Sequence, residues 1–230
     1  MINKTRLLLC AGLLALPGFS MAAGDLSYSF VEADYINLSI DPFDDEGTVI
    51  EDFEDGNGWG ARASFAITDS FFAFGGYSAI DSDASFVDDG DILFVSDRDI
   101  KRFDIGAGFN MPMFEPVDMQ TDLVLRAAYS DVDFGDFDFG GIDGGGLDDL
   151  NEDSSDGFYV DALLRTQVAP WVELTGGARY NDLEADDSFS FIGAALFEIN
   201  PNWGINLEAN VGEDNTLLML GARFSFGAAN

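Results

Sequence analysis

Charged residues recur at every second position in several segments of this sequence, and their spacing indicates an ion-pair network on one shared face. Five arginines lie on that face: Arg62, Arg126, Arg165, Arg179 and Arg223. Six carboxylates are on the same face: Glu32, Asp34, Asp104, Asp161, Glu173 and Glu208. An unpaired guanidinium in a narrow interior is costly, so we expect these groups to pair with one another. We interpret the network as structural filling, with an ion pathway as the alternative.

A second group of acids lies in glycine-containing stretches such as "DPFDDEG", "DDGD" and "DGGGLDDLNEDSSDG". Carboxylate oxygens are the ligands that Ca²⁺ and Mg²⁺ prefer, although the spacing does not match an EF-hand. The candidate ligands are Asp44, Asp45, Asp88, Asp89, Asp148 and Asp149. We interpret these stretches first as a solvated acidic surface. The alternatives are specific metal sites, or Ca²⁺ and Mg²⁺ held loosely by these acids. We expect no other cofactor.

Composition excludes several classes of function. The chain has 43 acidic and 10 basic residues and a formal net charge of −33, which argues against binding nucleic acid phosphates. It contains no histidine, the residue that most often supplies a catalytic base near neutral pH. Its acidic pairs lie in exposed stretches, with no predicted pocket to shift their pKa. We therefore predict that the protein is not an enzyme.

Alternation with period two runs along most of the chain, and helical periodicity is nearly absent. Ten segments read as strands of roughly the length that a tilted strand needs to cross a bilayer. They are residues 27–38, 57–67, 71–80, 101–111, 121–131, 158–168, 171–182, 188–199, 203–212 and 216–226. We predict an all-β fold, an antiparallel up-and-down transmembrane barrel of ten strands, with eight strands as the alternative.

The predicted connections alternate in character. "TDS", "PMFEPVDMQ", "AP" and "PN" follow the second, fourth, sixth and eighth strands and are mostly short. Residues 39–56, 81–100 and 132–157 form three long connections after odd-numbered strands, and most of the acids lie in or beside the odd-numbered connections. Short turns at one end and long loops at the other are typical of outer-membrane barrels.

The start of the sequence has the features of a secretory signal peptide. Lys4 and Arg6 precede the apolar run "LLLCAGLLAL", and small residues before Gly24 suit cleavage. We predict a signal peptide over residues 1–23 and a barrel domain over residues 24–230. Cys10 lies within the signal, so no disulfide is expected in the mature chain.

The composition of the two strand faces predicts which one meets lipid. One face is uniformly apolar, as in Leu218, Leu220 and Phe224, whereas the other mixes glycines with long Arg and Glu side chains. Small and large polar residues together suit a crowded interior. Aromatic residues near the strand ends predict two girdles at the membrane interfaces. Their members are Trp59, Tyr129, Trp171, Tyr180, Trp203, Phe224 and Phe226.

Three stretches give the chain a family resemblance: "YSFVEADYINL", the hairpin region "VELTGGARYNDLEADDSFSFIGAALFEINPNWGINLEANVG", and the closing "LLMLGARFSF". Together they resemble the small outer-membrane β-barrel family that includes the OmpA transmembrane domain and OmpX-like proteins. The resemblance covers nearly all of residues 24–230. It implies recognition by the barrel-assembly machinery through a terminal strand whose last aromatic is Phe226. Outer-membrane enzymes of similar size use a catalytic histidine, which this chain lacks.

These observations predict a non-enzymatic protein of the bacterial outer membrane with a filled polar lumen and long acidic surface loops. Its expected role is structural or in surface interaction, and its expected partners are outer-membrane lipid and lipopolysaccharide. One alternative is a narrow porin-like channel that favours cations because its vestibule is acidic. Another is a soluble periplasmic ligand-binding barrel, in which the apolar face would point inward.

Overall fold

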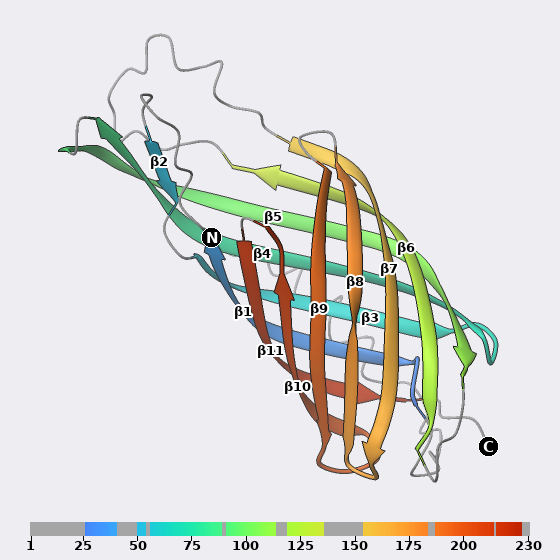
Figure 1. The fold of residues 1–230 in the computed structure, drawn as a ribbon. Helices are drawn as coiled ribbons and strands as arrows, with labels where there is room; N and C mark the ends of the chain where they lie inside the picture. The colour runs from blue at the N-terminus through green and yellow to red at the C-terminus, as the bar shows by residue number, and fades with distance from the viewer. Residues whose placement is uncertain are drawn as a thin grey trace, which may run out of the picture.

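A computed structural model describes residues 26–40, 50–53, 56–88, 91–113, 119–135, 154–183, 187–213 and 215–226. Every regular element among them is a β-strand (Figure 1). The strands are β1 (Phe30–Ile40), β2 (Ile50–Phe53), β3 (Gly56–Ala66), β4 (Phe71–Asp88), β5 (Asp91–Pro112), β6 (Thr121–Phe134), β7 (Ser154–Ala169), β8 (Val172–Leu183), β9 (Asp187–Glu198), β10 (Trp203–Val211) and β11 (Asn215–Ser225). No helix in these ranges is long and apolar enough to span a membrane.

Ten of the strands close into a barrel, and all their pairings are antiparallel. Consecutive strands pair from β3 to β11, and β1 pairs with both β3 and β11. The barrel therefore has no open edge at which backbone hydrogen-bonding groups would be left unpaired in lipid. The ten-strand prediction is confirmed, and the eight-strand alternative is wrong. The remaining strand, β2, lies outside the ring and pairs with the far end of β4.

The sequence analysis predicts a long loop over residues 81–100, and the structure differs. β4 and β5 continue through it as paired strands, from Asp81 opposite Asp99 to Asp88 opposite Asp91. Figure 1 shows both strands projecting beyond the rest of the barrel. Only two residues, Asp89 and Gly90, separate them, and this pair of residue types favours a tight hairpin turn. The acidic composition of the segment concealed that signal.

The segment 39–56 also differs from its prediction. It contains β2 and the last two residues of β1, and its final residue begins β3. β2 pairs with the projecting part of β4, with Ile50 opposite Val87 and Phe53 opposite Ala84. The predicted signal peptide lies outside the described residues.

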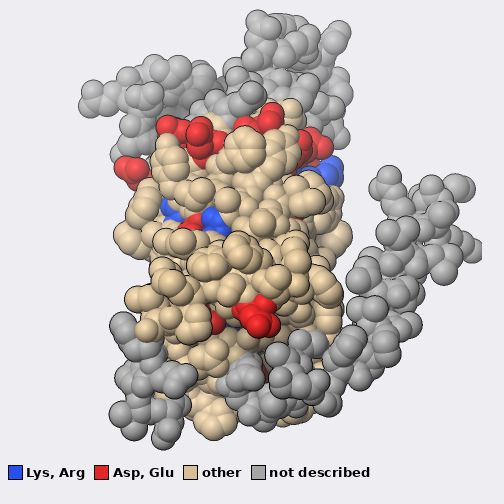
Figure 2. All heavy atoms as spheres, turned by 90° about the vertical axis from the view of Figure 1, so that its right-hand side faces the viewer, with Lys and Arg blue, Asp and Glu red and all other residues tan. Residues whose placement is uncertain are grey.

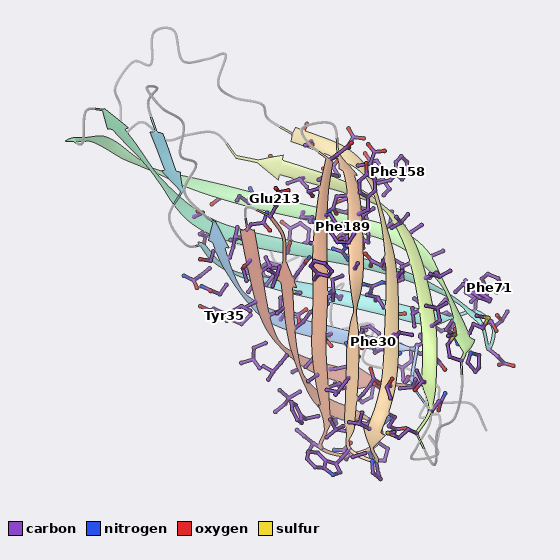
Figure 3. All side chains as sticks on the ribbon, viewed as in Figure 1. Phe30, Tyr35, Phe71, Phe158, Phe189 and Glu213 are labelled. Atoms are coloured by element: carbon purple, nitrogen blue, oxygen red, sulfur yellow. The ribbon has the colours of Figure 1, made fainter. Side chains whose placement is uncertain are left out.

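The outer surface of the barrel is apolar over most of its height. Phe65, Phe158 and Phe191 have 59%, 63% and 63% of their surface exposed. In Figure 3, Tyr35, Phe71 and Phe158 project away from the ribbon. Figure 2 shows a mostly uncharged band with acidic residues gathered along its upper rim. An apolar surface this extensive is unfavourable in water and matches the lipid-facing band of a membrane barrel.

Candidate functional site

The lumen collects the charged residues whose alternation was noted in the sequence. Because side chains alternate across a strand, each of these residues points inward while its chain neighbours point outward. Glu32 and Asp34 come from β1, Arg62 from β3, Asp104 from β5, Arg126 from β6, Asp161 and Arg165 from β7, Glu173 and Arg179 from β8, Glu208 from β10 and Arg223 from β11. All eleven lie inside the barrel, and the structure joins them in small groups.

Glu32 is the centre of the first group. It receives ion pairs from Arg62 of the neighbouring β3 and from Arg223 of the neighbouring β11. The Asn206 amide nitrogen donates to the same carboxylate at 3.1 Å. The Glu32 side chain is fully buried. One carboxylate thus holds together strands on both sides of β1.

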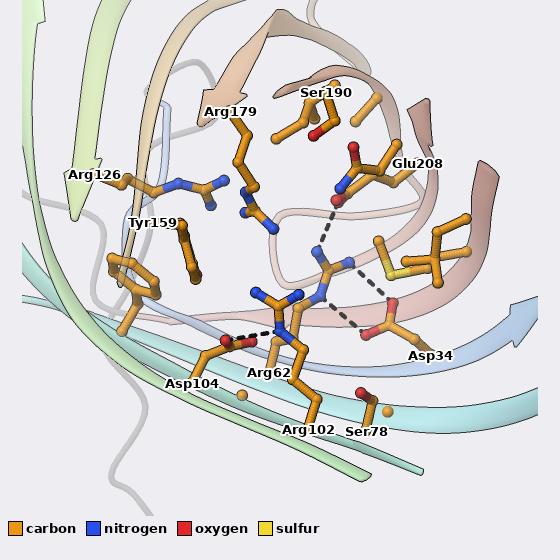
Figure 4. A pocket seen from close by; sticks show the side chains of 18 of the residues that line it. Asp34, Arg62, Ser78, Arg102, Asp104, Arg126, Tyr159, Arg179, Ser190 and Glu208 are labelled. Atoms are coloured by element: carbon orange, nitrogen blue, oxygen red, sulfur yellow. Dashed lines mark hydrogen bonds and ion pairs between the residues drawn. The ribbon is translucent and has the colours of Figure 1, made fainter. Parts of the chain in front are cut away.

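Arg62 extends this group across the lumen (Figure 4). Its Nε lies 3.0 Å from Asp34 Oδ2, and its Nη1 lies 2.6 Å from Glu208 Oε2 on β10. With Glu32, Arg62 therefore contacts three carboxylates. The Glu208 contact ties β3 to a strand that is not its neighbour.

Asp161 is the centre of a second group on the opposite wall. Arg126 Nη2 lies 2.6 Å from Asp161 Oδ2, and Arg179 Nε lies 2.7 Å from Asp161 Oδ1. Cross-strand register produces this arrangement, because Asp161 of β7 sits directly between Arg126 of β6 and Arg179 of β8. The Asp161 side chain is fully buried.

The lumen also contains an ion pair that the sequence analysis did not include. Arg102 Nε donates to Asp104 Oδ1 at 2.9 Å, and both residues lie on β5. Arg102 occupies the same face as Asp104 because the two are separated by one residue. Arg102 lies within the predicted strand 101–111, so the alternation that places Asp104 on the lumen face also places Arg102 there.

Aromatic and apolar side chains close the lumen near the short turns. Tyr28, just before β1, stacks on Phe72 of β4 with ring centroids 5.0 Å apart. Its hydroxyl donates to Asp122 of β6 at 2.7 Å, and the guanidinium of Arg165 of β7 lies 4.6 Å from its ring centroid. Tyr28 thus reaches strands on the far side of the ring. Around it lie four buried apolar residues, Phe72, Val124, Leu163 and Ile192.

Arg165 and Glu173 complete this closing layer, which we call the lumen floor (Tyr28, Phe72, Asp122, Arg165 and Glu173). Arg165 donates to both Glu173 oxygens, at 2.5 and 2.8 Å, in a bidentate pair. Asp122 is 1% exposed, so little water reaches this level. The sequence predicted Arg165 and Glu173 inside, but Tyr28 and Asp122 were not singled out.

The side chains of the lumen floor are closely packed, so adding a methyl group there tests the packing. A methyl group at Gly108 of β5 would lie 2.1 Å from the Phe72 ring, whereas one at Gly193 of β9 would meet no atom within 4 Å. We expect Gly108→Ala to lower the free energy of unfolding by about 1–3 kcal/mol, the usual cost of overpacking. Gly193→Ala is the matched control and should change it little. Urea titrations in lipid vesicles measure both, and equal effects would contradict the packing described.

Above the floor the lumen is not completely filled. A cavity of about 650 Å³ extends from Arg165 and Thr175 up to rim residues such as Glu213 and Asn215. Arginines, carboxylates and apolar side chains all contribute to its lining. The prediction of a filled lumen therefore describes the floor better than the upper part.

The structure places the predicted aromatic residues toward the two ends of the barrel. Trp203 packs on Phe224 at 5.0 Å, and Phe226 follows Phe224 at 6.3 Å, beside the short turns. Trp171 lies in the turn between β7 and β8. Trp59 packs on Tyr77 at 5.6 Å, Tyr129 packs on Phe158 at 5.6 Å, and Tyr180 is exposed, all toward the long connections.

The predicted metal ligands have no described geometry. Asp44, Asp45, Asp89, Asp148 and Asp149 lie outside the described residues, and Asp88 is placed as the last residue of β4. Within the described ranges, no three His, Cys, Asp or Glu side chains are grouped so that they could hold a metal ion.

Comparisons with known proteins bear on the fold alone. No family model matches the chain, and no curated protein matches it. Among solved structures it is similar to OprG of Pseudomonas aeruginosa, with 11% identity, a TM-score of 0.48, and coverage of 91% of this chain and 100% of that chain. It is also similar to the KdgM porin in complex with disordered oligogalacturonate, with 10% identity, a TM-score of 0.44, and coverage of 85% and 99%. Ail of Yersinia pestis gives 14% identity, a TM-score of 0.36, and coverage of 87% and 100%.

These scores are low, and the fold rests on the strand pairing itself. A closed antiparallel ring satisfies the backbone in lipid, and its exterior is apolar while its charges are inside. Closed barrels of this kind belong to bacterial outer membranes. The protein is an outer-membrane β-barrel. The soluble alternative is wrong because it requires the apolar face to point inward.

Proposed function

We propose that this barrel is a non-enzymatic, non-conducting outer-membrane protein with a structural or surface-interaction role. The observation that supports the proposal most directly is the lumen floor. Tyr28 bridges to Asp122 across the barrel, and Arg165 pairs with Glu173 beside it. Ions crossing the barrel would have to break these contacts or pass the buried apolar cluster around Phe72.

The ion-pair groups support a structural role for the rest of the lumen. Glu32 and Asp161 are fully buried carboxylates, and each joins two arginines from the strands on either side of it. Such ties resist separation of neighbouring strands in the plane of the membrane. They also satisfy guanidinium groups that would otherwise be costly to bury.

The long connections carry the interaction part of the proposal. At the rim, acids lie opposite one another across strand pairs, as with Asp81 and Asp99 or Asp182 and Asp187. Like charges in such positions repel, and divalent cations shared with lipopolysaccharide phosphates would relieve the repulsion. We include outer-membrane lipid and lipopolysaccharide among the proposed partners. Placement with the small OmpA- and OmpX-like barrels, and assembly by their machinery, belong to the same proposal.

Planar lipid bilayers test the proposal. Purified protein should insert, as judged by heat-modifiable gel mobility of the same preparation, and give no steady unitary current steps. Reproducible steps from the unmodified protein would favour the alternative of a narrow channel and would contradict a closed floor.

A further inference from the structure

Three guanidinium groups collect on one wall of the lumen cavity, around the ring of Tyr159. Arg179 Cζ lies 3.9 Å from the Tyr159 ring centroid, and Arg102 Cζ lies 5.4 Å from it. Arg126 joins them through Asp161, which it shares with Arg179. All four side chains, Arg102, Arg126, Tyr159 and Arg179, line the cavity (Figure 4). We call these four residues the arginine wall.

The arginine wall carries one more positive charge than its ion-pair partners neutralise. Its three arginines form ion pairs with two carboxylates among the described residues, Asp104 and Asp161. Glu208, the nearby acid on β10, forms its ion pair with Arg62 instead. A guanidinium that is shared in this way retains capacity to bind a further oxyanion.

Arg102 is the member with the least satisfied side chain. Its described ion pair is with Asp104, through Nε. Its Nη2 is buried and has no hydrogen-bond partner among the described residues, and it is the one cationic nitrogen there in that condition. Leaving a charged donor buried and unpaired is unfavourable, so a bound acceptor at this position would be stabilised.

Apolar side chains also line this cavity, some of them on the strands that flank Arg102. Ile36 of β1 and Ile80 of β4 are 3% and 6% exposed, and with Val132 and Met219 they line the upper lumen. The cavity volume of about 650 Å³ lies in the range of small-molecule sites. A pocket in which apolar side chains lie beside a cationic wall matches a molecule that has an acidic group and a compact carbon skeleton.

We propose that the cavity binds a small organic acid, with its carboxylate against Arg102 and its carbon skeleton against Ile36 and Ile80. The planar guanidinium suits a carboxylate because two N–H donors can meet two oxygens. The acidic rim opposes entry of anions, but salt screens such exposed charges beyond about 8 Å at physiological ionic strength. The proposal adds a ligand-binding role to the structural one and does not depend on whether the floor conducts ions.

Three probe molecules separate the contribution of the carboxylate to binding from that of the apolar group. Benzoate carries both a carboxylate and an apolar ring, benzamide is its uncharged analogue, and acetate lacks the ring. Calorimetric titration of the purified barrel in detergent, against a detergent blank, should show saturable binding of benzoate. We expect at least tenfold weaker binding of benzamide and of acetate. Equal binding of benzoate and benzamide, or no binding above the blank, would overturn the proposal.

Variants of two adjacent residues locate the site. Arg102→Gln removes the unpaired donor. Lys101→Gln removes a positive charge from the adjacent residue of β5, and Lys101 pairs with Asp99 outside the lumen. Benzoate affinity should fall at least tenfold in the first variant and remain unchanged in the second. If the glutamine variant fails to fold, Arg102→Lys replaces it in the test. The lysine keeps the positive charge but lacks the planar guanidinium, so benzoate binding should weaken several-fold. Unchanged affinity in a folded Arg102 variant, or equal losses in the 101 and 102 variants, would refute the assignment.

Discussion

Replacing Glu32 by glutamine should lower the free energy of unfolding by about 3–5 kcal/mol, the usual cost of breaking a buried ion pair. Glu32 is the described ion-pair partner of Arg223 and one of three for Arg62. The substitution keeps the volume and removes the charge, so Arg223 would be left buried without a counter-ion. Urea titration of the protein in lipid vesicles, followed by tryptophan fluorescence, measures the change.

The matched control for this prediction is Glu213→Gln. Glu213 is an exposed residue near the rim, so the same chemical change there should alter the free energy of unfolding by less than about 0.5 kcal/mol. If the two variants unfold at the same urea concentration, Glu32 does not hold the strands on either side of β1. That result would remove the main support for a structural lumen.

Removing the two stacked rings of the lumen floor should convert a silent barrel into a conducting one. Tyr28 and Phe72 fill the lumen beside the Arg165–Glu173 pair, and Tyr28 also hydrogen-bonds to Asp122. With Tyr28→Ala and Phe72→Ala combined, the floor loses both rings and keeps Asp122 and the Arg165–Glu173 ion pair. We expect unitary current steps in planar bilayers from the double variant, and fewer or smaller steps from Tyr28→Ala alone.

Tyr35→Ala provides the control for the floor experiment. Tyr35 is 57% exposed on the outer surface, so its loss removes an aromatic ring without opening the lumen. This variant should remain silent, as should the unmodified protein. A double variant that keeps heat-modifiable mobility and still gives no steps would show that the barrel is closed elsewhere.

Sequence alternation predicted the architecture well because a barrel strand has one environment on each side. The period of two identified all ten ring strands, and the contrast between faces placed residues such as Arg223 inside and Leu220 outside. The hairpin of β4 and β5 was missed because its strands extend beyond the apolar band. There the apolar residues Ile92, Leu93 and Phe94 follow one another instead of alternating with polar ones, so no period of two marks a strand.

The sequence was less informative about which side chains pair with one another within the lumen. The pairing of Glu32 with Arg62 follows from register, since the two residues are direct cross-strand neighbours. The contact between Arg62 and Glu208 depends instead on how far each side chain reaches across the ring. Tyr28 lies within the predicted strand 27–38, on the same face as Glu32, but alternation does not show how far its side chain reaches across the ring. The cavity arises from the balance of small and large side chains over all ten strands.

The central claim is that the apolar side of each strand faces lipid while the neighbouring residues face an enclosed lumen. Leu220 and Met219 of β11 are adjacent, yet Leu220 is 50% exposed on the outer surface and Met219 lines the cavity. A nitroxide label attached at Leu220→Cys or Met219→Cys, with the protein in lipid vesicles, reports collisions with lipid-soluble oxygen and with a water-soluble nickel chelate. The account predicts that oxygen collisions dominate at position 220 and that they are much reduced at position 219. The reverse pattern, or equal oxygen accessibility at the two positions, would contradict it.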